Sequence, residues 1–190
     1  MAILEILEVP DPRLKIVSSP VAPDEFDDDL KQLAADMLET MYDAPGIGLA
    51  AIQVGVPKRL LVIDLQPEDP DAEPVACDHD GHSHTHPATK REPRVFVNPV
   101  IVDPAEEYTT FNEGCLSVPE IYADVDRPAT CTVRYQDLDG KAHEEHLEGL
   151  LATCLQHEMD HLEGILFIDH LSRLKRQMAL KKLKKIRQAA

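Results

Sequence analysis

The sequence lacks the features of a membrane protein or of a disulfide-stabilised protein. It has no Trp, only four Phe and four Tyr, and no apolar run near the roughly 20 residues of a membrane-spanning helix. Its four Cys are too few and too scattered for a dense disulfide framework. The N-terminal segment shows no basic leader followed by an apolar stretch, so we predict no signal peptide and a cytoplasmic location.

Positive charge is scarce except at one end of the chain. The formal net charge is −16, yet segment 171–190 contains eight Lys or Arg and no acid, which leaves −24 on residues 1–170. An acidic surface repels nucleic acid, so we predict no specific DNA binding. The basic segment predicts a helix that either packs on its own domain or docks on an anionic surface. Its predicted apolar face consists of Leu171, Leu174, Met178 and Ile186.

The periodicity of apolar residues predicts an α+β domain, with antiparallel or mixed sheets around a central helix and further helices towards both ends. Residues 28–43 have the spacing of an amphipathic helix, and the central helix is expected to begin near Glu148. Pro99 indicates that its strand is an edge strand or is bent. We expect one domain over 1–170, followed by the basic helix 171–190. The predicted strands are 59–65, 95–102, 130–136 and 143–147, the last two joined by a turn at 137–140.

The most informative motif lies on the predicted central helix and runs from His157 to His161 with the sequence HEMDH. Side chains four residues apart lie on one helical face, so both His can bind one metal ion. Glu158 would then lie beside the open position of the metal, where a carboxylate can move protons for a water molecule. The motif predicts hydrolysis without specifying the bond. The alternative is an amphipathic helix whose His face solvent or satisfy neighbours.

Two His do not complete a catalytic metal site, which usually has three protein ligands. The metzincin pattern would require a third His where this chain has Phe167, and no acid lies far enough downstream for a thermolysin-like site. Cys115, in the segment EGCLS, is the candidate, because a thiolate binds zinc or ferrous iron and Gly114 allows the backbone to aim it. The alternative is that Cys115 is a small buried hydrophobe.

A third segment, GIGLAAIQ at residues 46–53, combines two Gly that permit close approach of another backbone with one polar amide. Gln53 either has a buried hydrogen-bond partner or donates to a reacting oxygen.

In this order, GIGLAAIQ, EGCLS and QHEMDHL resemble the three signature motifs of the peptide deformylases. The resemblance spans nearly the whole chain. It implies a metal-dependent hydrolase that removes the N-formyl group from the N-terminal formyl-methionine of nascent polypeptides and releases formate. It also implies that the C-terminal helix can dock on the ribosome.

The same resemblance implies a role for each motif residue. The expected metal is Fe(II), with Zn(II) or Ni(II) as alternatives, and its ligands would be Cys115, His157 and His161. Glu158 would move the proton, while the Gln53 amide and the Leu116 N–H would meet the oxyanion. The predicted substrate-binding residues are Ile47, Gly48, Phe111 and Gly114. We also expect Tyr122 on a nearby loop, and a pair of Glu113 with Arg127 that braces the ligand-bearing segment.

Residues 66–94 depart from the family pattern as an insertion with a His-rich centre. Short His-rich tracts bind transition metals, so we predict either a flexible acidic loop or an auxiliary metal site. The auxiliary ligands would be His79, His82, His84 and His86. Two rival classes remain at this point: another metallohydrolase, such as a peptidase or amidase, and a binding protein without catalysis.

Overall fold

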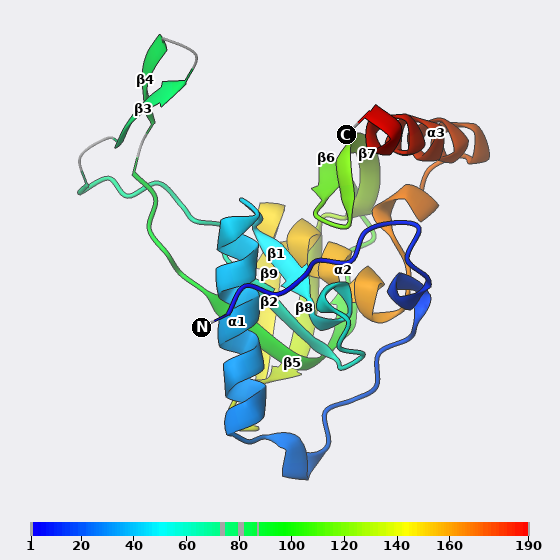
Figure 1. The fold of residues 1–190 in the computed structure, drawn as a ribbon. Coiled ribbons are helices and arrows are strands. Elements are labelled where there is room, and N and C mark those ends of the chain that lie inside the picture. The colour runs from blue at the N-terminus through cyan, green and yellow to red at the C-terminus, as the bar shows by residue number, and fades with distance from the viewer. Residues whose placement is uncertain (1, 73–74, 80–81, 87, 190) are drawn as a thin grey trace.

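The computed structural model describes residues 2–72, 75–79, 82–86 and 88–189. Its main element is a fully antiparallel five-stranded sheet in the order β1-β2-β5-β8-β9 (Figure 1). The strands are β1 (Gly48–Ala50), β2 (Leu60–Ile63), β5 (Arg94–Pro104), β8 (Thr130–Gln136) and β9 (Ala142–Glu148). Two long helices pack on the sheet, which confirms the α+β prediction.

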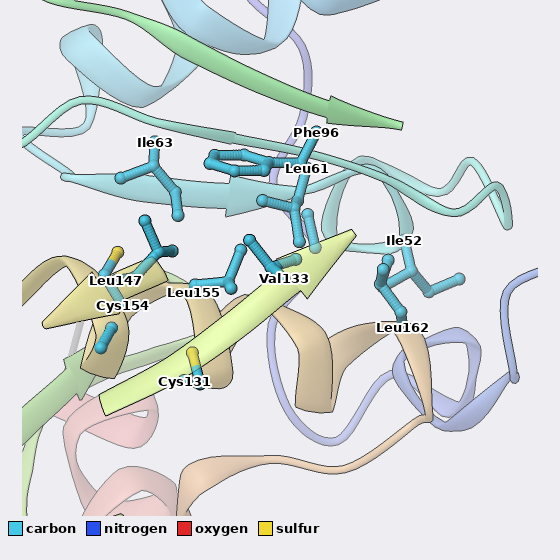
Figure 2. Packing of buried hydrophobic residues seen from close by; sticks show 12 residues of the cluster. Ile52, Leu61, Ile63, Phe96, Cys131, Val133, Leu147, Cys154, Leu155 and Leu162 are labelled. Atoms are coloured by element: carbon cyan, nitrogen blue, oxygen red, sulfur yellow. The ribbon is translucent and has the colours of Figure 1, made fainter. Parts of the chain in front are cut away.

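Helix α1 (Asp28–Asp43) and helix α2 (Gly149–Leu162) cover opposite faces of the sheet (Figure 1). Strand β2 shows why, because its four side chains are apolar and point alternately to the two faces. Leu60 and Val62 pack in the cluster with α1, whereas Leu61 and Ile63 pack in the cluster with α2 (Figure 2). Helix α1 begins at a side-chain cap, since the Asp27 carboxylate accepts a hydrogen bond from Leu30 N at 3.0 Å.

Strand β5 bends at Pro99 but is not an edge strand. It lies between β2 and β8, and its pairing with β8 shifts register between Val97 and Val100. Asn98 has a φ of 50° there, and its side chain bonds to both backbone groups of Val21 at 2.8 and 2.9 Å. The prediction of a bend is confirmed and the edge alternative is wrong, because a bulge accommodates the missing N–H inside a sheet.

A separate hairpin, β6 (Tyr108–Cys115) and β7 (Val118–Pro128), lies on the other side of α2, so that α2 is central as predicted. Tyr122 belongs to strand β7 and not to a loop, which corrects the prediction.

Helix α3 (Arg173–Ala189) packs on this hairpin, with Ala179 and Leu183 buried against Val125 and its neighbours. Of the predicted apolar face, Leu171 packs partly buried against the same cluster, whereas Leu174 and Met178 are 67% and 63% exposed, so the prediction is wrong for these two residues. Small Ala179 lets the helix approach the strand more closely than a long side chain would.

The insertion carries a short hairpin of β3 (Val75–His79) and β4 (His82–His86), which projects away from the body of the molecule (Figure 1). The predicted auxiliary metal site at His79, His82, His84 and His86 depends on side chains outside the described part of the structure, and it stays a prediction. Among the described helices, none is long and apolar enough to cross a membrane.

Candidate metal centre

Two buried imidazoles lie on the face of α2 that is turned away from solvent. The ring centroids of His157 and His161 are 5.1 Å apart, as expected for residues one turn apart. The Nδ1 of His157 contacts Glu113 Oε2 at 2.8 Å. Because Nδ1 donates this hydrogen bond, Nε2 is the nitrogen of His157 that can bind a cation once it is deprotonated.

Cys115 reaches this pair from the end of β6. Its Sγ lies 3.2 Å from His161 Nε2, and one ligand atom from each of Cys115, His157 and His161 falls within 4.8 Å of the others. One sulfur and two imidazole nitrogens form a donor set that suits zinc and ferrous iron, and three protein ligands leave one position open. The residues therefore fit a catalytic divalent metal ion.

Gly114 acts by leaving space. A Cβ at Gly114 would lie 2.5 Å from the ring of Tyr122, so the Tyr ring can pack beside the backbone that precedes Cys115 only because Gly114 has no side chain.

Glu158 follows His157 directly on α2 and lines the same cavity as His157. It is 4% exposed, and its Oε2 has no hydrogen-bond partner among the described residues. Burial raises the pKa of Glu158 to about 7, although His157 and Arg127 act in the opposite direction. A Cβ on Gly48 would lie 2.5 Å from Glu158 Oε1, so Gly48 makes room for this carboxylate.

The Gln53 amide lies beside the same centre, and both its oxygen and its nitrogen have hydrogen-bond partners. Its Oε1 accepts from Ala50 N at 2.8 Å, while its Nε2 donates to Ser117 Oγ at 3.1 Å and lies 3.6 Å from Cys115 Sγ. Ser117 was not identified from the sequence. It could have been, because its hydroxyl lies between the apolar residues Leu116 and Val118 and needs a hydrogen-bond partner when buried.

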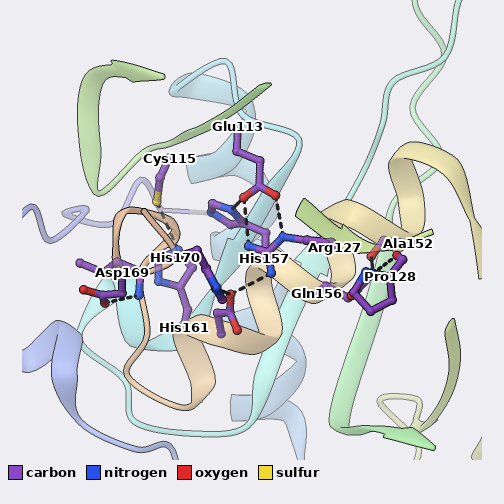
Figure 3. Close-up of polar contacts among 12 residues, drawn as sticks. Glu113, Cys115, Arg127, Pro128, Ala152, Gln156, His157, His161, Asp169 and His170 are labelled. Atoms are coloured by element: carbon purple, nitrogen blue, oxygen red, sulfur yellow. Dashed lines mark hydrogen bonds and ion pairs between the residues drawn. The ribbon is translucent and has the colours of Figure 1, made fainter. Parts of the chain in front are cut away.

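A chain of charged groups extends from His157 to the surface (Figure 3). Glu113 pairs with Arg127 at 2.5 and 3.0 Å, as predicted, and both side chains are buried. Beyond them, Arg127 Nη1 and His170 Nε2 contact the same oxygen of Asp160, at 2.9 and 2.7 Å. Asp160 and His170 were not identified from the sequence, because nothing in their spacing relates them to Arg127.

The pKa values of the two candidate ligand His shift in opposite directions. Burial lowers the pKa of His157, but contacts with Cys115 and Glu113 outweigh burial and raise that pKa well above its ordinary value. Burial, followed by the charge of His157, lowers the pKa of His161 well below its ordinary value. Ligation requires a neutral imidazole, so binding of a cation releases the proton of His157.

A cavity of about 490 Å³ opens beside the centre. All four residues predicted to bind substrate line it, namely Ile47, Gly48, Phe111 and Gly114, together with Gln53, Cys115, Leu116, His157 and Glu158. The sequence analysis missed three residues from α2 that also line the cavity, Leu150, Thr153 and Cys154. Their signal was the i, i+3, i+4 spacing that precedes His157.

Comparisons with known proteins agree with this geometry. A family model described as polypeptide deformylase matches residues 3–177. The peptide deformylase of Novosphingobium aromaticivorans is 77% identical over 190 residues, which cover 100% of both chains. The chain belongs to the polypeptide deformylase family. It is thus a metallohydrolase that removes the N-formyl group from nascent polypeptides, and the family uses a catalytic metal.

Solved deformylase structures share the fold. The crystal structure of a peptide deformylase from Legionella pneumophila has 46% sequence identity and a TM-score of 0.82, covering 99% of this chain and 97% of that one. A Met-Ala-Ser bound class I type b peptide deformylase from Acinetobacter baumannii has 32% identity and a TM-score of 0.76, covering 90% of this chain and 99% of that one.

Proposed function

We propose that this deformylase holds its metal with Cys115, His157 and His161 and that Glu158 moves the proton during hydrolysis. The observation that supports the proposal most strongly is the convergence of one sulfur and two imidazoles, within 4.8 Å, next to the buried Glu158 carboxylate. A bound divalent ion supplies Lewis-acid chemistry, polarising the formyl oxygen and lowering the pKa of water.

Glu158 is the proton carrier in this proposal. Its Oε2, without a partner among the described residues, accepts a proton from the attacking water. As the C–N bond of the formamide breaks, Glu158 returns this proton to the amine nitrogen of the methionine. A carboxyl with a pKa of about 7 suits both steps, since it is neither a strong acid nor a strong base at neutral pH.

Gln53 and Leu116 provide hydrogen-bond donors for the developing oxyanion. The contacts of Gln53 with Ala50 N and Ser117 Oγ hold the amide in one orientation, so little reorganisation is needed when charge develops. Leu116 follows Cys115 directly and lines the cavity, and its backbone N–H is the second donor in this proposal.

The substrate binds along the cavity wall. Gly48 begins strand β1 and lies at the end of the five-stranded sheet, so an extended peptide can pair with its backbone. The apolar residues Ile47 and Phe111 line the space for the methionine side chain, and Gly114 lines the same cavity without adding a side chain.

Fe(II) is the metal we propose, with Zn(II) or Ni(II) as alternatives, because the sulfur and nitrogen donors suit each of them. The test is anaerobic purification, metal analysis, and formate release from formyl-Met-Ala-Ser after reconstitution with each ion. We expect one ion per chain at this centre and the highest turnover with Fe(II). Turnover without bound metal would contradict the proposal.

The role of Glu158 is tested by Glu158→Ala, with Glu148→Ala as the matched control at the exposed start of the same helix. We expect Glu158→Ala to keep its metal and lose about 100- to 10,000-fold in turnover. Glu148→Ala should retain both. Near-normal formate release by Glu158→Ala would remove Glu158 from its assigned role.

We further propose that the basic helix α3, separate from a catalytic unit over residues 1–170, docks on the ribosome, and that the enzyme acts in the cytoplasm, where its thiolate stays reduced. The exposed ammonium groups of Lys181, Lys184 and Lys185 support docking on an anionic surface. Co-sedimentation with ribosomes should weaken when these three Lys become Glu, and unchanged co-sedimentation would contradict the proposal. Cell fractionation tests the location.

A further inference from the structure

A second groove lies between α3 and the β6–β7 hairpin, outside the catalytic cavity. Its volume is about 480 Å³. Strand β7 contributes Tyr122 and Asp124 to its walls, and helix α3 contributes Lys175, Met178 and Lys182.

This groove adjoins the substrate cavity. Asn112, Ile121 and Tyr122 line both of them. The Tyr122 ring packs beside Gly114, the residue before Cys115. The two hollows therefore share a wall at Tyr122, and a peptide that left the cavity over this ring would enter the groove.

The chemistry of the groove is apolar and positively charged. Met178 and Tyr122 are 63% and 70% exposed, so both present apolar surface to an occupant of the groove. Lys175 has no ion-pair partner within the described residues, whereas Lys182 Nζ donates to Glu120 O at 2.9 Å. The one carboxylate, Asp124, already accepts a hydrogen bond from the Asn112 amide at 2.8 Å.

The positive charge of the groove contrasts with residues 1–170. These carry a formal charge of −24 within a net charge of −16, so an acidic peptide approaching that part of the surface is repelled. Lys175 and Lys182 reverse the sign of the local charge where the cavity ends.

We propose that this groove binds the downstream part of the substrate peptide, beyond the residues held in the catalytic cavity, and that it favours acidic and apolar side chains there. This inference rests on the proposed substrate-binding role of the cavity. We choose the substrate as the occupant because the groove and the cavity share lining residues. A peptide bound in the cavity by its N-terminus continues out of it.

The experiment compares three amidated substrates with the metal-loaded enzyme: formyl-Met-Ala-Ser, the same peptide extended by Glu-Leu-Glu-Leu, and the same peptide extended by Lys-Leu-Lys-Leu. We expect a KM roughly 3- to 10-fold lower for the Glu extension than for the Lys extension, with similar kcat, since exposed ion pairs have modest energies. The difference should shrink at high salt.

Charge reversal at Lys175 tests whether the groove is responsible. Lys175→Glu should abolish or reverse the preference between the two extensions. Lys184→Glu is the matched control, because it makes the same change on the same helix outside the groove, and it should keep the preference. Met178→Ala should weaken binding of both extended peptides.

The outcomes separate this inference from the proposed function. If the tripeptide is not deformylated, the proposed site roles fail; if it is deformylated but both extensions share its KM, only the groove proposal fails. An equal effect of Lys184→Glu and Lys175→Glu would indicate a general charge effect and overturn the proposal. Loss of tripeptide turnover in Lys175→Glu would also overturn it, because Lys175 would then support the fold instead of the groove.

Discussion

The hairpins β6–β7 and β8–β9 each place a carboxylate against a His, in opposite surroundings. Glu113 of strand β6 meets His157 of helix α2 at 2.8 Å, and the two side chains are 5% and 10% exposed. In β8–β9, Asp137 meets His143 at 2.7 Å, and these side chains are 36% and 33% exposed. The two distances are nearly equal, so the two contacts differ in their exposure to solvent and in the other hydrogen-bond partners of each carboxylate.

The buried pair continues into a network of charged side chains, whereas the other hydrogen bonds of Asp137 among the described residues come from the backbone N–H groups of Asp139 and Lys141. Glu113 also binds Arg127, which continues to Asp160. A buried carboxylate without partners would be protonated, but His157 and Arg127 overcome the effect of burial and lower the pKa of Glu113. A carboxylate therefore fixes the orientation of a His ring that can bind a metal only when burial removes the competition of water.

The largest difference is expected when each carboxylate is removed. Glu113→Ala leaves Arg127 buried without its main partner and frees the His157 ring to rotate. We expect a loss of about 3–5 kcal/mol in the free energy of unfolding, and a 10- to 100-fold loss of metal affinity. Asp137→Ala should change both far less. Denaturant titration and metal competition measure these quantities, and equal effects of the two variants would contradict the comparison.

Removal of a hydroxyl from each hairpin should give a smaller difference. Ser117 at the β6–β7 turn accepts from the buried Gln53 amide at 3.1 Å. Ser117→Ala leaves that amide without this partner, which we expect to cost about 1–3 kcal/mol of stability and to lower kcat. In β8, Thr132 meets His146 at 3.3 Å on the exposed face. Thr132→Ala should stay within about 0.5 kcal/mol of wild type; a kcat loss in this variant would refute the distinction.

Substitution of the glycine in each hairpin should affect different properties: stability for Gly140 and substrate binding for Gly114. Gly140 has a φ of 77° in the β8–β9 turn, so Gly140→Ala should cost about 1–2 kcal/mol of stability and leave turnover unchanged. Gly114→Ala pushes on the Tyr122 ring, which can move outwards into solvent. We expect a small loss of stability and a raised KM for formyl-Met-Ala-Ser. Thermal unfolding and steady-state kinetics on both variants check this reversal.

The smallest expected effect concerns acid. Hydrogen bonds from His143 and from the backbone N–H groups of Lys141 and Asp139 lower the pKa of Asp137 below its ordinary value of 3.8. The ionised carboxylate therefore contributes stability above that ordinary value, and the contribution disappears as pH falls through the lowered pKa. Wild type and Asp137→Asn should differ in melting temperature at pH 7 and converge at low pH. A difference that grows on acidification would contradict the assignment.

Local patterns predicted most elements closely. The helix at 28–43 and the strand at 130–136 are observed with the same bounds, because their apolar spacing matches one helical face and one sheet face. The apolar face of α3 was predicted wrongly at two positions. Leu174 and Met178 have the spacing of one helical face, but strand β7 packs against Ala179 and Leu183 instead.

The sequence by itself determined the two His on one helical face, since a four-residue spacing has one geometric meaning in a helix. The resemblance of three ordered motifs identified the family, and the comparisons confirmed it. Only the tertiary structure decided that Cys115, 42 positions before His157, lies beside it, and that Ser117, Asp160 and His170 complete the surroundings. The physical reason is that contacts across long loops depend on how the sheet, α2 and the β6–β7 hairpin pack together, which no local spacing encodes.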